Sequence, residues 1–344
     1  MSTVMSRGSR SVQAGRGSRR DVPAVKCPHI CWPQPPPPSR CRTEIATGPS
    51  ALMNYSSWQH AKHLSGHGLA YHLYIPPLEL RASRRLPLVL WLHGGIWTQF
   101  DSYDENELVN GSIFAAAQRV MPHYLLRPIA RRRENWVRVG PHTGSHPLSG
   151  KPPPSLGLAS KLLDDVLNDP AHMAYIDRER LVIAGASMGG YGVWELIQRR
   201  PNLFRAAIPI CGGGDLERAR LLNATRIWAF HSADDPIVPV NASREMIRAT
   251  LAVRYGAQNH GAWSTRKMYS YMNTSGGMRQ KLEAIETISK GERTRFADLR
   301  YTEYVGGGHD AWTRALNIAG LARWALRPPK GARLRRKVKL RETT

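Results

Sequence analysis

The chain lacks any long hydrophobic segment. None of the apolar runs among its 344 residues approaches the length needed to cross a bilayer, although hydrophobic residues make up an ordinary 42% of the sequence. Its first residues, "MSTVMSRGSRSVQAGRGSRR", also lack the apolar core of a secretory signal. These absences predict a protein without a membrane span and favour a cytoplasmic location.

Cysteine is scarce, with four residues in the whole chain. Cys27, Cys31 and Cys41 lie close together, and His29 stands between the first two, so a zinc site has to be considered. Their spacing matches no common zinc-ligand pattern, and the proline-rich stretch before Cys41 folds back poorly. We therefore predict no metal site, and we interpret Cys211, which closes an apolar run, as a buried thiol.

Acidic residues are also few, with 26 Asp and Glu against 49 Lys and Arg, which leaves a net charge of +23. More than half of this excess lies at the ends, because residues 1–52 carry six surplus positive charges and residues 327–344 carry seven. Such tails can contact nucleic acid or anionic surfaces. We interpret them as solvated segments and predict no obligate nucleic-acid partner.

The composition divides the chain into three parts. Residues 1–52 are rich in Arg, Ser and Pro and show no apolar periodicity, which is typical of disordered segments. A pattern typical of folded proteins begins at Met53. We predict a disordered basic extension at 1–52, one folded domain at 53–326 and a basic C-terminal tail at 327–344.

Within the folded part, apolar runs alternate with helical patterns. The predicted strands are 86–93, 124–130, 180–186, 206–211, 226–232 and 299–305, and the predicted helices are 155–168, 189–200, 242–255 and 311–326. Several strands are apolar on both faces, as expected inside a covered parallel sheet. The alternation predicts an α/β fold with a mostly parallel central sheet flanked by helices.

One segment interrupts this alternation. Residues 257–298 separate a predicted helix from the last predicted strand, and they contain a further helix candidate, "GGMRQKLEAIETISK". Insertions of this length are commonly functional or disordered. We predict that this one forms a cap or side wall over the active site.

The stretch "GASMG" places Ser187 between two glycines, directly after an apolar strand and before a helical pattern. A serine hydroxyl is a weak nucleophile unless a base removes its proton. A sharp strand-to-helix bend exposes such a serine and needs glycines on both sides of it. Ser187 is therefore the candidate nucleophile.

Two more reactive side chains follow strand ends, where ligands collect in parallel sheets. Asp235 follows 226–232 and can orient an imidazole, with Asp234 as its rival by position. His309 follows 299–305 and three glycines. Ser187, Asp235 and His309 occur in the chain order of the α/β-hydrolase triad, so we predict that they form a catalytic triad.

Acyl transfer also needs N–H donors for the oxyanion that develops on the substrate. The backbone N–H of Met188, directly after the nucleophile, is one candidate. The second is expected in the loop after 86–93, where we choose Gly95, with Ile96 as the alternative. His93 is interpreted as a structural residue that orders this loop.

With these residues in place, the chain resembles the α/β-hydrolase superfamily from about Tyr71 to about Leu326. Within it, the sequence looks like the branch of esterases related to polyhydroxybutyrate depolymerases, feruloyl esterases and "predicted peptidases". The resemblance rests on "LVLWLHGG", "GASMGGYGVWEL", "IPICGGGD", "WAFHSADDPIVPV" and "GGGHDAWTRAL". It implies that 53–326 is the catalytic domain, and its D-x-x-V-P turn favours Asp235 over Asp234. The loop after His-Gly-Gly departs from the usual pattern of that branch, which implies a different acyl pocket.

The resemblance implies a serine hydrolase that cleaves a small-molecule carboxylic ester through an acyl-enzyme, without metal or organic cofactor. Two alternatives remain open. One is a serine peptidase, because "SMGGY" also resembles the catalytic domain of prolyl-oligopeptidase-type enzymes. The other is a non-catalytic hydrolase-fold protein that binds nucleic acid or membranes through its basic tails.

Overall fold

The structure is a computed structural model. It describes residues 59–66, 68–95, 121–140, 142–255, 263–273, 279–289, 298–318 and 320–327. The predicted extension at 1–52, the tail from 328 onward and Ile96 therefore lie outside the described residues. All of the described residues belong to the unit Met53–Thr344.

A ten-stranded sheet runs through the described part of the chain in the order β1-β2-β4-β3-β5-β6-β7-β10-β9-β8. The strands are β1 (Gln59–Leu64), β2 (Ala70–Ile75), β3 (Leu86–Leu92), β4 (Tyr124–Pro128), β5 (Ile176–Ala186), β6 (Ala206–Ile210), β7 (Arg226–Ser232), β8 (Trp263–Asn273), β9 (Arg279–Ser289) and β10 (Leu299–Tyr304). The six strands from β4 to β10 are parallel, and the outer strands at both ends are antiparallel. The predicted α/β class with a mostly parallel sheet is confirmed.

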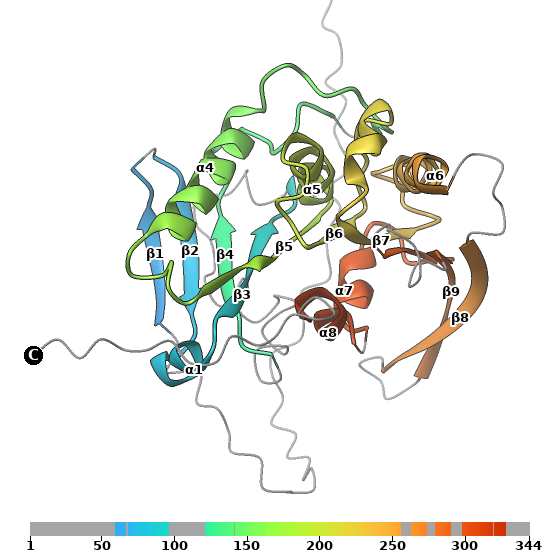
Figure 1. Cartoon of the computed structure of the whole chain (residues 1–344). Helices are drawn as coiled ribbons and strands as arrows, with labels where there is room; N and C mark the ends of the chain where they lie inside the picture. The colour runs from blue at the N-terminus through green and yellow to red at the C-terminus, as the bar shows by residue number, and fades with distance from the viewer. Residues whose placement is uncertain are drawn as a thin grey trace, which may run out of the picture. The chain divides into compact units, whose positions relative to one another are not determined.

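Helices cover both faces of the sheet (Figure 1). They are α1 (Leu78–Ser83), α4 (Pro154–Asn168), α5 (Met188–Arg199), the 3-10 helix η3 (Glu217–Leu222), α6 (Asn241–Tyr255), α7 (Ala311–Leu316) and α8 (Leu321–Leu326). Leu88 and Leu90 face the core with α4, α5 and α6, whereas Val89 faces the core with α7 and α8. Because successive strand residues point to opposite faces, strands covered on both sides must be apolar throughout.

The predicted helix in "GGMRQKLEAIETISK" is wrong. Residues 279–289 form β9, which pairs antiparallel with β8 along its whole length and with β10 on its other side. The segment contains residues with good helix propensity, but propensity is a weak preference that pairing with two neighbouring strands overrides. The described part of the insertion is thus a β-hairpin that extends the sheet.

The predicted helix 311–326 is also wrong in part, because the chain forms two helices there. α7 ends at Leu316, and α8 begins after Gly320, whose backbone lies in the left-handed region at φ 93°. A left-handed glycine ends a helix without a steric penalty. The six predicted strands and the other three predicted helices lie within a few residues of their predicted bounds.

Candidate active site

Ser187 lies at the junction of β5 and α5, in a conformation that an L-residue rarely adopts. Its φ is 56° and its ψ is −119°. Its N–H donates to the carbonyl of Ile210 at the end of the neighbouring strand β6 (2.8 Å), which helps to hold this conformation. A strained serine between a strand and a helix is the geometry of a nucleophile elbow.

The two glycines of "GASMG" are required by close approach of the backbone. A Cβ on Gly189 would overlap the carbonyl oxygen of Leu92 at the end of β3, and a Cβ on Gly185 would lie 2.6 Å from the carbonyl oxygen of Gly189. Neither clash can be relieved by rotating a side chain, because the contacted atoms belong to the backbone. The elbow therefore packs directly against the end of β3.

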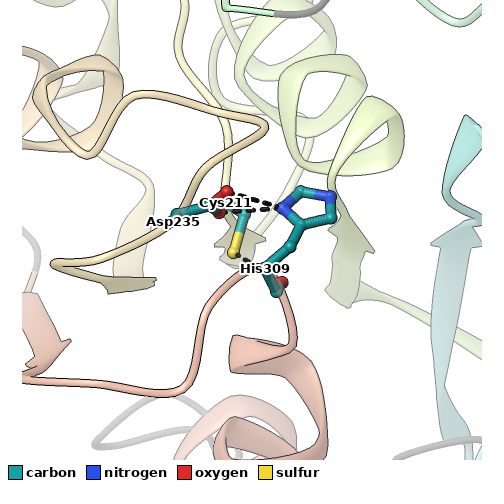
Figure 2. A group of neighbouring side chains, drawn as sticks. All are labelled: Cys211, Asp235 and His309. Atoms are coloured by element: carbon teal, nitrogen blue, oxygen red, sulfur yellow. Dashed lines mark hydrogen bonds and ion pairs between the residues drawn. The ribbon is translucent and has the colours of Figure 1, made fainter. Parts of the chain in front are cut away.

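The structure brings the three predicted side chains together at the carboxyl edge of the sheet. His309 Nε2 lies 2.8 Å from Ser187 Oγ, and His309 Nδ1 lies 2.8 Å and 3.0 Å from the two carboxylate oxygens of Asp235. Figure 2 shows the carboxylate of Asp235 directed toward the imidazole of His309. The Asp235 side chain is fully buried, whereas that of His309 is 20% exposed. In such an arrangement the imidazole can take the proton of the hydroxyl, while the carboxylate orients the imidazole.

Asp235 is surrounded by hydrogen-bond donors. Its Oδ1 accepts from the N–H groups of Ile237 and Val238, both at 2.9 Å, and its Oδ2 lies 3.4 Å from Nε2 of His231. Burial by itself would raise the pKa of Asp235, but the hydrogen bonds from His231, His309 and these two N–H groups lower the pKa well below its ordinary value. The carboxylate is therefore ionised throughout the working pH range of proteins.

Asp234, the rival carboxylate, has a different partner. Its two oxygens accept from the N–H groups of Gly307 and Gly308, at 3.0 Å and 2.9 Å, and no hydrogen bond to His309 is found for it. Gly307 and Gly308 both have positive φ, so this contact holds the unusual backbone that leads into His309. The sequence alone did not indicate this supporting contact.

His93 lies beside the elbow and is held by its neighbours. Its Nδ1 donates to the Gly94 carbonyl (2.8 Å), and its Nε2 accepts from the N–H of Ala130 (3.0 Å). Burial lowers the pKa of His93 to about 4, so the ring is neutral at pH 7. These contacts fit the predicted structural role of His93 in ordering the loop.

The two described candidates for oxyanion donors lie next to each other. Met188 follows the nucleophile, and a Cβ on Gly95 would lie 3.8 Å from the Cβ of Met188. A Cβ on Gly94 would lie 3.7 Å from that of Ser187, so this loop passes alongside the nucleophile. Ile96, the alternative to Gly95, lies outside the described residues.

Cys211 lies between Asp235 and His309 in Figure 2, and it has a positive φ of 52°. Its buried thiol lies 3.6 Å from the carbonyl oxygen of His309, and its sulfur, one Asp235 oxygen and one His309 nitrogen all lie within 4.8 Å of one another. Burial raises the pKa of the Cys211 thiol well above its ordinary value, and metals bind the thiolate. The geometry therefore favours a packing role, and the absence of a metal in the reaction stays a prediction.

No helix in the described ranges is long and apolar enough to cross a membrane. One family model matches the chain, that of the prolyl oligopeptidase family, over residues 165–222. This segment includes β5, the elbow at Ser187 and α5. No curated protein matches the sequence.

Solved structures match over most of the chain. A thermostable esterase is 26% identical with a TM-score of 0.57, and the match covers 78% of this chain and 62% of that one. An acetyl xylan esterase from Aspergillus awamori is 13% identical with a TM-score of 0.48, over 74% of this chain and 94% of that one. A ferulic acid esterase is 15% identical with a TM-score of 0.46, over 78% and 97%. The chain thus spans less than two thirds of the thermostable esterase.

Proposed function

We propose that this chain, which has the α/β-hydrolase fold, is a serine hydrolase that cleaves carboxylic esters of small molecules. The observation that carries the proposal is the unbroken hydrogen-bonded series from Ser187 through His309 to Asp235, with the serine held in a strained elbow. The likeness to a thermostable esterase supports an ester as the substrate.

In the proposed mechanism, Ser187 Oγ attacks the ester carbonyl while His309 Nε2 accepts the hydroxyl proton. Asp235 keeps the imidazole oriented through Nδ1 and stabilises its positive charge. The N–H groups of Met188 and Gly95 donate to the oxyanion of the tetrahedral intermediate. When the intermediate collapses, His309 returns the proton to the leaving alcohol.

The acyl group is then bonded to Ser187 as an ester. A water molecule loses a proton to His309 Nε2 and attacks this acyl carbonyl, and the second tetrahedral intermediate releases the carboxylic acid and restores the Ser187 hydroxyl. Each proton taken up by His309 is returned within the cycle. The proposed reaction needs no metal or organic cofactor.

A serine peptidase is the second candidate, favoured by the match to the prolyl oligopeptidase family model. The same three residues can hydrolyse an amide if His309 protonates the leaving amine. Comparing turnover of a p-nitrophenyl ester with that of a peptide anilide separates the two activities, and we expect the ester to be preferred.

The proposal is tested by labelling and by removing the nucleophile. A fluorophosphonate should modify Ser187, and Ser187→Ala should lower kcat for ester hydrolysis by about 10⁴-fold or more, because the remaining groups supply only oxyanion stabilisation and binding. Ester turnover at the wild-type rate by a folded Ser187→Ala variant would falsify the mechanism. Salt-sensitive binding to DNA by a wild-type chain that no fluorophosphonate labels would favour the non-catalytic alternative.

A further inference from the structure

His231 lies behind Asp235, on the side away from His309. It is the next-to-last residue of β7, and its side chain is fully buried. Its Nδ1 lies 2.8 Å from Ser243 Oγ on α6, and its Nε2 lies 3.0 Å from the carbonyl oxygen of Val238. The same Nε2 lies 3.4 Å from Asp235 Oδ2, the oxygen nearest to His309 Nδ1.

The partners of Nε2 determine where its proton is. The Val238 carbonyl and the Asp235 carboxylate are both acceptors, so an Nε2 without a proton would direct its lone pair at two negative oxygens. The Ser243 hydroxyl is compatible with either state of Nδ1, because it can donate to a bare Nδ1 of His231, or accept from an Nδ1–H while it donates to the Gly212 carbonyl at 2.9 Å. Whichever of these the hydroxyl donates to, Nε2 of His231 carries a proton.

The proton on Nε2 of His231 contacts both ends of the turn that contains Asp235, the proposed acid. The turn runs from Asp235 to Val238, and Asp235 Oδ1 already accepts the N–H of Val238. The Nε2–H of His231 contacts the Val238 carbonyl and the second oxygen of Asp235. The carboxylate is therefore held between two imidazoles, and only the outer one, His309, reaches the serine.

We infer that His231 is a positioning residue, whose Nε2–H fixes the Asp235 carboxylate at the orientation that His309 needs. The inference rests on the proposed function, because it concerns the acid of the proposed triad. The described partners of the His231 ring are Ser243, Val238 and Asp235, so His231 acts on the proposed triad through Asp235. The Ser243 hydroxyl supports it from α6, which ties the orientation of the acid to that helix.

Two amide substitutions separate this role from general packing. In His231→Gln, the amide nitrogen reaches the position of Nε2 and can donate to Asp235 and Val238. In His231→Asn, which is shorter by one methylene, the amide reaches only the position of Nδ1 and contacts Ser243. We expect kcat for ester hydrolysis to stay within about threefold of wild type in His231→Gln and to fall by about ten- to a hundredfold in His231→Asn, with KM nearly unchanged, because the substrate does not touch this residue.

The matched control is the same pair of substitutions at His123. That histidine is also fully buried and bonds a backbone carbonyl, that of Met121 (2.7 Å), but it precedes β4 and so lies at the opposite edge of the parallel strands. Both His123 variants should keep wild-type kcat. Equal kcat in His231→Gln and His231→Asn, at equal melting temperature, would overturn the inference.

A second measurement covers the case in which the His231 variants do not fold. In wild-type protein labelled with ¹⁵N-histidine, long-range ¹H–¹⁵N spectra report which ring nitrogen carries a proton, and the His231 signals are assigned by the shift of Nδ1 in Ser243→Ala. We expect a protonated Nε2, and an unprotonated Nε2 would overturn the inference. This reading does not depend on turnover, so failure of the proposed function would appear separately, as a wild-type chain that neither hydrolyses esters nor reacts with a fluorophosphonate.

Discussion

Two adjacent aspartates after β7 hold different parts of the proposed active site. Asp235 directs its carboxylate inward, to His309 and His231, whereas Asp234 directs its carboxylate to the backbone of Gly307 and Gly308. One residue therefore orients the imidazole, and its neighbour holds the loop that carries it. At the scale of single residues, the proposed chemistry depends on this division.

Replacing each aspartate by asparagine should give very different results. Asp235→Asn should lower kcat by about 10⁴-fold, because the amide presents a donor to His309 Nδ1 and favours the wrong tautomer of the ring. Asp234→Asn should lose only a few-fold activity, since the amide oxygen still accepts one of the two glycine N–H groups. Steady-state ester hydrolysis measures both, and the reverse ranking would show that Asp234 is the acid.

At the scale of elements, the glycines on either side of the junction between β5 and α5 have no room for a Cβ. Gly189 faces the carbonyl oxygen of Leu92, so the start of α5 packs on the end of β3 through backbone atoms. This contact brings the Ser187 turn beside the loop that begins at His93. The distance between the proposed nucleophile and the proposed oxyanion donors thus depends on a glycine.

Gly189→Ala should therefore destabilise the protein by about 3 kcal/mol, because either the helix or the strand end must move to accept the methyl group. Urea unfolding monitored by circular dichroism gives the free energy of unfolding. Gly150→Ala is the control, since a Cβ at that exposed position meets no atom within 4 Å, and it should change stability by less than about 0.5 kcal/mol. Equal effects of the two substitutions would contradict the packing argument.

We also expect the β8–β9 hairpin to contribute to function. It pairs with β10, the strand that leads into His309, and Tyr304 at the carboxyl end of β10 lies opposite Ala284 of β9. Arg279–Glu283 of β9 therefore continue beyond that end, on the side of the proposed active site. We propose that this insertion helps to select the substrate. Its role as a cap or side wall remains a prediction.

Replacing residues 258–296 by a short Gly-Ser linker tests this role. We expect labelling by fluorophosphonate to persist, because Ser187, Asp235 and His309 are all retained, while the preference among esters of different acyl length changes. The preference is measured as kcat/KM over a panel of p-nitrophenyl esters. An unchanged preference would show that the insertion does not contribute to the substrate site.

At the scale of the whole molecule, buried neutral histidines make the fold sensitive to acid. Burial lowers the pKa of both His93 and His123 from 6.5 to about 4. The unfolded chain binds a proton at each histidine below pH 6.5, whereas the folded chain does not until about pH 4. The contribution of these two neutral histidines to the free energy of unfolding is therefore fully present above pH 6.5, and it is lost as the pH falls toward 4.

We expect the free energy of unfolding to decrease between pH 7 and pH 4 by up to about 3 kcal/mol for each of the two histidines. Urea unfolding at several pH values measures this decrease. His123→Gln should unfold with a shallower pH dependence over the same range, because glutamine does not titrate. A variant whose pH dependence matches that of wild type would show that burial of His123 contributes nothing to acid sensitivity.

The sequence by itself determined the parallel sheet and the three proposed catalytic residues. Strands such as 226–232 are apolar on both faces, and that pattern is written directly in adjacent residues. The glycines around Ser187 and the polar residues after the strand ends are equally local signals. Since all parallel strands end at one edge, local signals were enough to predict that Ser187, Asp235 and His309 meet.

Tertiary structure alone decided the features that depend on partners distant in sequence. Residues 279–289 have helix-forming composition but become β9 because β10 and β8 supply backbone hydrogen bonds on both sides. In the sequence, Asp234 is a rival to Asp235 and His231 is one residue of a strand. Their contacts with Gly307 and Gly308 and with Ser243 appear only in the folded chain. A hydrogen-bond partner brought near by folding leaves no periodicity in the chain, so only the folded arrangement reveals it.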